Sequence, residues 1–390
     1  MSVVSRQDGP KCAKLEVGPG VESVCAPSQC PLSGRGAILP DVDPTLVLVN
    51  PRAGGGRGIA RWQAVCHDAD AIAELSVVVP KDAAGTVAAV AEAVGDGCRR
   101  VVVFGGDGTV RLVADTLLRL GAAGDVTIGV IPAGTGADFA RALGVPRDRR
   151  QALAPALTGI GRPLDVGAID GGASGVHGLV GTPSDRGFVG ATCGDGLVGV
   201  SSDVRALASP GAAATFVNIA SFGLSGEVAR AVNAVPNRGG LTFLAATVRA
   251  FRRFEPCPVR VSVDGTEVAT GPALLVAIAN GTTFGRGMRI APNASLTDGL
   301  LDVIIVAPIP AWALAWRLPQ LYLGRHLKAS PVRVFRGATV VVEPESTAPA
   351  WELDGEPGGA GRRVVRVRPG AMRIVTGSAV AVPSAAGDDM

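Results

Sequence analysis

Residues 101–109 read Val-Val-Val-Phe-Gly-Gly-Asp-Gly-Thr, and this stretch constrains the fold of the chain more than any other. A β-branched run stops at a glycine turn, and a segment with helical character follows from Val110 to Leu120. A buried strand that leads through glycines into a helix is typical of phosphate sites in open α/β sheets, because the glycine backbone and the first helical N–H groups can approach an anion. Asp107 would repel a phosphate unless a metal ion or a ribose hydroxyl lay between them. The turn therefore indicates metal-linked nucleotide chemistry.

Two further glycine turns follow apolar strands in the first 140 residues. A predicted strand over 45–49 ends at Asn50 and the glycines of 54–58, and a predicted strand over 126–131 leads into Pro-Ala-Gly-Thr-Gly-Ala-Asp at 132–138. Between them we predict a strand over 76–79 and a helix over 83–94. The repeated order of strand, turn and helix predicts a parallel sheet, in which ligands bind at the carboxyl ends of the strands. We expect the three turns to converge there.

The pattern changes after Asp165. Short alternating runs predict a mostly antiparallel β domain, with strands over 259–263, 273–279, 300–306, 339–342 and 364–367. The Gly/Ser/Ala-rich stretch 171–212 contains Cys193-Gly194-Asp195-Gly196 but no apolar strand before it, so we interpret it as an inserted loop. The predicted organisation is a disordered leader over 1–43, a nucleotide-binding α/β domain over 44–165, a β domain over 166–378 and a flexible tail over 379–390.

Composition narrows the class of partner and the compartment. A formal net charge of +3 is too small to indicate a nucleic-acid partner. Seven cysteines without metal-ligand spacing favour reduced thiols in the cytoplasm. No apolar run is long enough to predict a transmembrane helix. The sequence leaves open whether residues 1–43 direct the chain to an organelle and whether it forms a homodimer.

Two surface features have alternative interpretations. Arginines cluster over 147–150, 249–253 and 362–368, either as a solvated surface or as contacts to an anionic substrate or membrane. Residues 308–328 contain Trp312 and Trp316 among Leu and Pro. A packed helix is the favoured interpretation, because prolines interrupt the amphipathic period, and an interfacial membrane element is the alternative.

A set of motifs in fixed order resembles one known family. The motifs are Val49-Asn50-Pro51 with its glycines, Gly105-Gly106-Asp107-Gly108-Thr109, Pro132-Ala133-Gly134-Thr135 with Asp138-Phe139-Ala140-Arg141, residues 216–223, 280–292 and 298–302, and Asp354-Gly355-Glu356. Over about residues 45–378 the chain resembles the diacylglycerol kinase catalytic-domain family, which includes sphingosine, ceramide and bacterial lipid kinases. The resemblance implies a first domain similar to those of NAD kinases and phosphofructokinases, a C-terminal antiparallel β-sandwich that carries part of the active site, and a last strand that returns to the first domain.

The resemblance also implies an ATP site. Phosphoryl transfer needs a cradle for the phosphates, a divalent cation and a base near the attacking hydroxyl. By similarity, the cradle and the other nucleotide contacts are Asn50, Gly54, Gly105, Gly106, Asp107, Gly108, Thr109 and Thr135. Arg52 and Arg57 are candidates to neutralise phosphate charge, with simple solvation of the loop as the alternative.

A magnesium site is implied at residues 295–300. Mg²⁺ prefers oxygen ligands, and by similarity Asp298 gives its carboxylate while Ser295 and Leu300 give main-chain carbonyls. The alternative is that Asp298-Gly299 is only a hairpin turn.

The turn Asp354-Gly355-Glu356 is the candidate for the base. By similarity, Glu356 accepts the proton of the lipid hydroxyl, and Asp354 orients Glu356 through water or a metal ion. The comparable Asp264-Gly265-Thr266-Glu267 lies between strand-like runs and is predicted to be an ordinary hairpin.

Two positions depart from the family pattern. Arg111 and Ala137 stand where the family often has Asn, which leaves room for a weak or inactive kinase.

The resemblance as a whole implies an ATP-dependent lipid kinase that acts on diacylglycerol, a sphingoid base or a related lipid by peripheral contact with a membrane. A nucleotide-binding relative with weak or lost catalysis and an NAD kinase-like enzyme are the alternatives.

Overall fold

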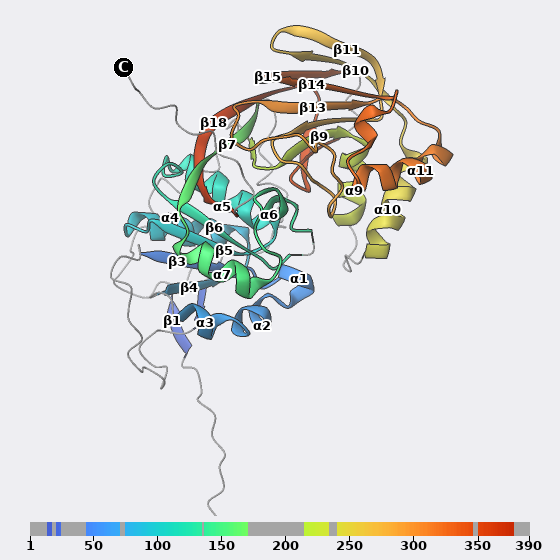
Figure 1. Ribbon diagram of the computed structural model, residues 1–390. Helices are drawn as coiled ribbons and strands as arrows, with labels where there is room; N and C mark the ends of the chain where they lie inside the picture. Colours follow the sequence, from blue (N-terminus) through green and yellow to red (C-terminus); the bar gives the residue numbers. More distant parts are fainter. Residues whose placement is uncertain are drawn as a thin grey trace, which may run out of the picture.

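The computed structural model describes residues 14–17, 21–24, 44–70, 75–134, 136–170, 214–233, 240–345 and 350–377 (Figure 1). Three features predicted from the sequence lie outside the described residues, namely Thr135, the inserted loop 171–212 and the tail 379–390. The leader predicted for residues 1–43 lies outside them too, except for two short strands, β1 (Lys14–Val17) and β2 (Val21–Val24). These form an antiparallel hairpin on the edge of the main sheet.

The N-terminal domain is a parallel sheet covered by helices on both faces. Its strands are β3 (Thr45–Val49), β4 (Leu75–Pro80), β5 (Arg100–Gly105) and β6 (Thr127–Pro132), in the order β4-β3-β5-β6. Every residue of β3 and β5 is buried, as expected for strands with both faces covered. The sequence therefore predicted both the elements and the direction of this sheet.

Two groups of helices pack on the two faces of this sheet. Helices α4 (Ala83–Gly95) and α5 (Asp107–Arg119) share one core with the sheet, and α2 (Gly58–Gln63), α3 (Cys66–Asp70) and α7 (Arg149–Thr158) share the other. The short helices α1 (Ala53–Gly56) and α6 (Asp138–Ala142) follow β3 and β6 directly. Three helices thus begin close to the carboxyl ends of β3, β5 and β6, where the glycine turns lie.

The C-terminal domain is a sandwich of two antiparallel layers. One layer is a six-stranded sheet that consists of β14 (Val332–Gly337), β13 (Leu301–Val306), β12 (Leu275–Ala279), β9 (Ile219–Gly223), β16 (Ala350–Leu353) and β17 (Glu356–Ala360). The other contains β15 (Thr339–Pro344), β10 (Cys257–Val263), β11 (Thr266–Ala273) and β8 (Ala214–Phe216). Phe216 and Val261 from one layer share a buried core with Phe222 and Trp351 from the other. This confirms the predicted sandwich.

Two long strands join the domains. β7 (Gly161–Asp170) and β18 (Arg363–Val375) pair antiparallel along most of their lengths, and β18 also pairs with β15 at one end and in parallel with β6 at the other. The last strand therefore returns to the first domain and makes one continuous sheet of both (Figure 1). The boundary expected between residues 165 and 166 falls inside β7.

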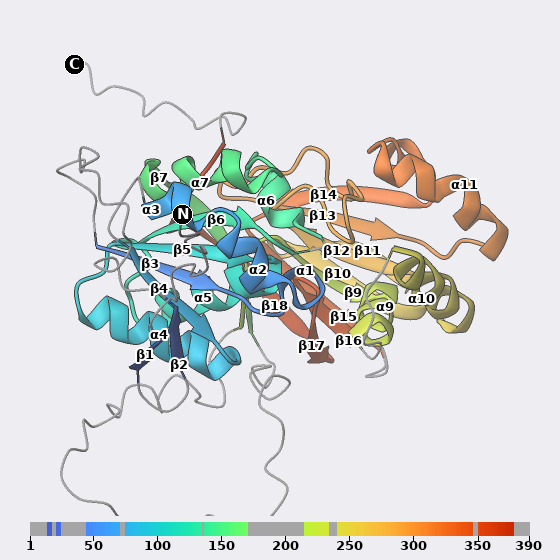
Figure 2. The ribbon, with the colours of Figure 1, turned by 90° about the horizontal axis from the view of Figure 1, so that it is seen from below.

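Helices gather at one end of the sandwich. α9 (Leu224–Asn233), α10 (Gly240–Arg253), α11 (Ala311–Tyr322) and the 3₁₀ turn η3 (His326–Lys328) lie at the end of the C-terminal domain away from β18 in two perpendicular views (Figures 1 and 2). Of the helices in the described ranges, none is long and apolar enough to cross a bilayer.

Candidate active site

The three glycine turns meet at the carboxyl ends of β3, β5 and β6. Asn50, directly after β3, donates from Nδ2 to Oγ1 of Thr109 at the start of α5, over 2.7 Å. The main-chain nitrogens of Ala133 and Gly134 donate to the carbonyl of Gly105 over 2.8 and 3.1 Å. The convergence predicted from the strand order is therefore present, and it is held by direct hydrogen bonds.

Close backbone contact explains two of the glycines. A Cβ atom at Gly134 would lie 2.8 Å from the Cα of Gly106, and one at Gly105 would lie 3.0 Å from Oγ1 of Thr109. Neither neighbour can move away cheaply, because one is backbone and the other is held by Asn50. Glycine at 105, 106 and 134 thus allows the turns after β5 and β6 to pack closely against each other beside the start of α5.

The first glycine turn surrounds an arginine that sequence reasoning missed. Gly54, Gly55 and Gly56 all have positive φ, and a Cβ atom at Gly54 would overlap the guanidinium of Arg61. Nη1 of Arg61 donates to the carbonyl of Ala133 over 2.7 Å, which joins the first turn to the third. Desolvation, with repulsion from Arg57 and Arg149, lowers the pKa of Arg61. The only sequence signal was its place in the helix after the turn.

Asp107 holds the third turn in place. Its carboxylate accepts hydrogen bonds from the main-chain nitrogens of Asp138, over 2.9 Å, and Phe139, over 3.2 Å, at the start of α6. Burial, followed by repulsion from Asp138, raises the pKa of Asp107 to about 7. Both carboxylate oxygens of Asp107 are thus hydrogen-bonded to main-chain nitrogens. An additional approach of Asp107 to a metal ion stays a prediction.

Asp138 in turn links the two domains. Its side chain forms an ion pair with Arg141 and accepts a hydrogen bond from the main-chain nitrogen of Arg286, over 2.7 Å. Its carbonyl accepts from Oγ1 of Thr283 over 3.2 Å. The loop around residue 285 in the C-terminal domain is therefore fixed against the third glycine turn.

The predicted catalytic turn is a tight hairpin between β16 and β17. Leu353 pairs with Glu356, and Asp354 and Gly355 between them have φ of +51° and +90°. Positive φ at both central residues is the pattern of a two-residue hairpin turn, for which Asp-Gly is a strong signal. The second Asp-Gly turn, at residues 264–265, forms the hairpin between β10 and β11, as predicted.

The two carboxylates of this hairpin have different surroundings. Asp354 accepts three hydrogen bonds of 2.8–3.0 Å, from the main-chain nitrogens of Val217, Asn218 and Ile219. Desolvation raises the pKa of Asp354, although Arg111 and these donors oppose the shift. Asp354 therefore anchors the hairpin to the start of β9 and the two residues before it, and its role in orienting the base stays a prediction.

Glu356, the first residue of β17, lies close in space to the start of helix α5. A Cβ atom at Gly108 would be 3.6 Å from Oε1 of Glu356, so this carboxylate of the C-terminal domain lies against the Gly-Gly-Asp-Gly turn of the N-terminal domain. Glu356 is partly buried. The structure therefore places the predicted base beside the predicted phosphate cradle, although both roles stay predictions.

A buried carboxylate beneath the hairpin was missed by sequence reasoning. Glu352 on β16 is buried, and its oxygens accept hydrogen bonds from the hydroxyl of Ser221 and the main-chain nitrogen of Gly355. Desolvation raises the pKa of Glu352 to about 7, with the nearby Asp354 adding to the shift and Arg111 opposing it. A glutamate inside the otherwise apolar Ala350–Leu353 was the only signal in the sequence.

Arg111, one of the two departures from the family pattern, contacts this hairpin. Its Nη1 donates to the carbonyl of Leu353 over 3.2 Å, and its charge acts on both Asp354 and Glu352. Ala137, the other departure, has a left-handed backbone with φ of +51° and ψ of +41°. Asn adopts this conformation more readily than Ala does.

The segment predicted to bind magnesium makes other contacts. The carboxylate of Asp298 accepts from the main-chain nitrogen of Leu300 over 3.1 Å and forms an ion pair with Arg336. The hydroxyl of Ser295 contacts Thr297. Among the described parts of the chain, no group of three or more His, Cys, Asp or Glu side chains is placed to hold a metal ion. In this arrangement the carboxylate of Asp298 is paired with Arg336, and the roles of Ser295, Asp298 and Leu300 as magnesium ligands stay predictions.

Asp165 attaches this segment to the strands that join the domains. Its carboxylate accepts from the main-chain nitrogens of Gly299 and Gly370 over 2.7 and 2.8 Å. The contacts of residues 295–300 thus run to β7, β18 and Arg336, whereas the glycine turns contact one another and the β16–β17 hairpin.

Comparisons with known proteins agree with both domains. Residues 44–169 match the diacylglycerol kinase catalytic domain, and residues 218–376 match the YegS C-terminal NAD kinase beta sandwich-like domain. The chain is 28% identical over 305 residues to a diacylglycerol kinase of Mycobacterium tuberculosis, and the aligned region covers 78% of this chain and 86% of the relative. It is 30% identical over 274 residues to a probable YegS-like lipid kinase of Xanthomonas euvesicatoria, which covers 69% of this chain and 75% of the relative.

A solved structure shares the fold. The crystal structure of a putative diacylglycerol kinase from Bacillus anthracis superposes with a TM-score of 0.62 at 22% identity, and the match covers 87% of this chain and 99% of the other. At this identity the likeness shows the fold alone.

Proposed function

Because this chain belongs to the family of diacylglycerol kinases and YegS-like lipid kinases, we propose that it uses ATP to phosphorylate a hydroxyl group of diacylglycerol, a sphingoid base or a related lipid. The proposal assigns the nucleotide to the N-terminal domain and the lipid hydroxyl to the place where Glu356 meets the start of α5. It rests on one observation above all, the approach of Glu356 to Gly108.

This approach supports acid–base chemistry at the start of α5. A lipid alcohol is a weak nucleophile, and a positioned carboxylate speeds its attack by taking the proton as the new bond forms. Glu356 comes from the C-terminal domain and Gly108 from the N-terminal domain, so a hydroxyl bound next to this contact would lie close to both a base and a phosphate cradle. Asp354 positions this base through its three hydrogen bonds to residues 217–219.

The glycine turns fit the phosphates of a nucleotide. The close packing of Gly105, Gly106 and Gly134 brings the turns after β5 and β6 together at the N-terminus of α5, which favours negative charge. Asn50 and Thr109 fix the cradle, and Arg61 adds positive charge beside it. When bound, ATP supplies the phosphoryl group that the lipid oxygen receives. Thr135 stays a predicted contact.

We assign no step to a metal ion held at Asp298, since Arg336 occupies its carboxylate. Magnesium enters this proposal only as the ion that accompanies ATP, whose charge it would partly neutralise. The roles of Ser295, Asp298 and Leu300 as ligands stay predictions that require Arg336 to move away.

The test is transfer of labelled phosphate from ATP with Mg²⁺ to lipids in mixed micelles. The panel contains diacylglycerol, monoacylglycerol, sphingosine, ceramide and phosphatidylglycerol, with NAD in a parallel reaction. Label in one lipid supports the proposal and identifies the substrate class, and label in NAD alone would replace the lipid kinase with an NAD kinase-like enzyme. If ATP binds to folded protein and no label is transferred, the chain is a relative that has lost catalysis.

A further inference from the structure

Helix α11 has an exposed apolar face. Trp312, Trp316 and Leu323 follow at intervals of four and seven residues, so they lie on one face of the helix, and they are 72%, 75% and 61% exposed. Pro319, on the same face, is exposed as well. The helix is held by its other side, where Ala313 is buried and Leu321 packs against the core beneath β12 and β13. The helix is thus packed on one side, as the sequence predicted, and leaves two tryptophans in solvent on the other.

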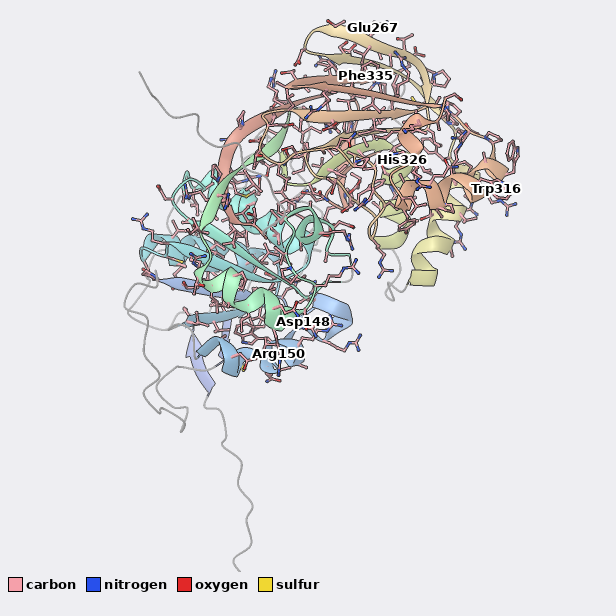
Figure 3. All side chains as sticks on the ribbon, in the orientation of Figure 1. Asp148, Arg150, Glu267, Trp316, His326 and Phe335 are labelled. Carbon is pink, nitrogen blue, oxygen red and sulfur yellow. The ribbon has the colours of Figure 1, made fainter. Side chains whose placement is uncertain are left out.

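The exposed face lies at the end of the C-terminal domain. Trp316 projects outward at the edge of the molecule, whereas His326 in the following turn lies inward, buried and in contact with the carbonyl of Ile290 (Figure 3). Helix α10 lies at the same end in two perpendicular views and exposes Val248 (Figures 1 and 2). Two helices therefore present apolar side chains at one end of the molecule.

The charge around this face is positive. Arg317 lies on α11, exposed Arg325 and Lys328 follow it, and no acidic residue occurs between Asp302 and Glu343. Helix α10 adds exposed Arg249, Arg252 and Arg253. The other two arginine clusters have acidic partners, in the pairs Arg150–Asp68, Arg362–Glu343 and Arg366–Asp170.

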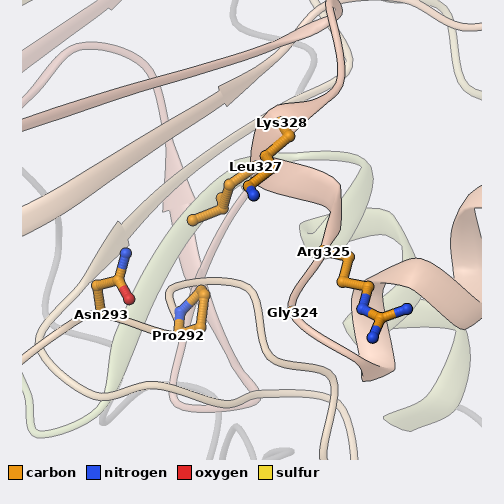
Figure 4. A pocket seen from close by; sticks show the side chains of 6 residues that line it. All are labelled: Pro292, Asn293, Gly324, Arg325, Leu327 and Lys328. Atoms are coloured by element: carbon orange, nitrogen blue, oxygen red, sulfur yellow. The ribbon is translucent and has the colours of Figure 1, made fainter.

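A hollow opens beside the C-terminal end of α11. It has a volume of about 520 Å³ and is lined by Pro292, Asn293, Gly324, Arg325, Leu327 and Lys328 (Figure 4). Its lining thus combines apolar side chains with two cations. This is the composition expected of a surface that contacts the apolar and anionic parts of a lipid together.

We propose that Trp312, Trp316 and Leu323 insert into the interfacial region of an anionic phospholipid bilayer, while Arg317, Arg325 and Lys328 contact its headgroups. Tryptophan is favoured at membrane interfaces, and each basic residue near an anionic surface adds to binding. The proposal deepens the proposed function and rests on it, because a lipid kinase must reach a substrate that stays in the bilayer. The chemistry favours a bilayer over a second copy of the chain, whose matching face would carry the same positive charge.

Vesicle binding by the full chain tests the proposal directly. Vesicles of phosphatidylcholine with and without phosphatidylglycerol are mixed with the protein, and bound protein is measured by flotation. We expect binding that needs phosphatidylglycerol and that falls about tenfold or more in the W312S/W316S double variant. I160A is the matched control, since Ile160 is 81% exposed on the N-terminal domain. R325Q/K328Q should weaken binding and R150Q should not, because Arg150 lies far from α11 (Figure 3).

Tryptophan fluorescence gives a second, independent reading. The chain has four tryptophans, of which Trp62 and Trp351 are 4% and 0% exposed. Lipids brominated in their acyl chains should therefore quench the fluorescence of Trp312 and Trp316 and leave the fluorescence of the two buried tryptophans unchanged. Unchanged flotation of W312S/W316S, equal binding to both kinds of vesicle, or a dimer that depends on these tryptophans would each overturn the proposal. Thermal unfolding of each variant verifies that it is folded.

The kinase assay separates this proposal from the proposed function. In W312S/W316S, phosphorylation of vesicle-borne diacylglycerol should fall relative to phosphorylation of a dissolved short-chain diacylglycerol. An unchanged ratio would contradict bilayer docking. A wild-type chain that binds and is quenched by anionic vesicles but phosphorylates neither lipid would refute the lipid kinase and keep the docking surface.

Discussion

Nη1 of Arg111 lies 3.2 Å from the carbonyl oxygen of Leu353 and donates a hydrogen bond to it, across 242 positions of the chain. This contact ties helix α5, which begins at the predicted phosphate cradle, to the hairpin that carries the predicted base. Its charge also faces the buried carboxylates of Glu352 and Asp354. Arg111 thus joins the two domains at the point where the candidate site lies.

Replacement of Arg111 by Met should therefore destabilise the protein. The change keeps an unbranched apolar stem but removes the cation that opposes the raised pKa values of Glu352 and Asp354, which we expect to cost about 3 kcal/mol. Urea unfolding at neutral pH measures it. The loss should be smaller when Glu352 is already Gln, and additive losses in this double-mutant cycle would contradict the electrostatic link.

Glu356→Gln should lower phosphate transfer by about 10²–10⁴-fold, because the amide cannot accept the proton of the hydroxyl. ATP binding, measured by calorimetry, should be unchanged. Glu267→Gln is the matched control, since Glu267 follows the other Asp-Gly hairpin and lies on the surface. Full turnover by the Glu356 variant would remove Glu356 from the role of base.

Glu352 should make the protein less stable as the pH rises. Its pKa is about 7 in the folded protein against an ordinary value of 4.5, so the folded state holds the proton more tightly. The contribution of Glu352 to stability is then largest below pH 4.5, decreases between pH 4.5 and 7, and stays at its lowest value above pH 7.

Glu352→Gln should remove this dependence. Gln can still accept from Gly355 and donate to Ser221, so we expect the variant to gain about 3 kcal/mol over the wild type at alkaline pH and little at acidic pH. Urea unfolding across the pH range measures the difference. The pKa of Asp107 is also raised to about 7, so the stability of the variant still decreases as the pH rises, but less steeply than that of the wild type. Parallel profiles for the two proteins would show that Glu352 does not titrate there.

Ala137→Asn should stabilise the fold by about 1 kcal/mol, because Ala137 has the left-handed backbone that Asn tolerates better. Ala137→Gly should act in the same direction. Ala91→Gly, inside the right-handed helix α4, is the control and should cost about 1 kcal/mol. Chemical unfolding compares all three, and a loss of stability in both Ala137 variants would argue against strain at this position.

Arg336→Ala should create a response to magnesium. In the wild type, Arg336 pairs with Asp298, so Mg²⁺ without nucleotide should leave the thermal midpoint unchanged. Without the guanidinium, Asp298 and the carbonyls of Ser295 and Leu300 become available to the ion, and binding should raise the midpoint with concentration. Arg336→Lys keeps the charge and should behave like the wild type. A rise in the wild type itself would show that Arg336 does not block binding of the ion.

Local sequence patterns predicted several strands of the fold correctly. The strands predicted over 45–49, 76–79 and 101–104 match β3, β4 and β5 within two residues at each end, because buried parallel strands are continuous apolar runs bounded by glycine turns. The prediction for 364–367 caught only part of β18, since the bulge around Gly370 interrupts the alternation. Helix α11 continues through Pro319 with Pro310 at its N-cap, although the prolines obscured its period.

The sequence by itself determined the order of elements in the N-terminal sheet, some strands of the β domain, the three glycine turns and the two Asp-Gly hairpins, because helical period, strand alternation and turn conformation depend on residues a few positions apart. Only the tertiary structure decided that Glu356 faces Gly108, that Arg61 lies under Gly54, that Glu352 is buried beside Arg111 and that Arg336 pairs with Asp298. These contacts join residues from different strands and helices. They depend on sheet order and on desolvation in the packed protein, which no local pattern encodes.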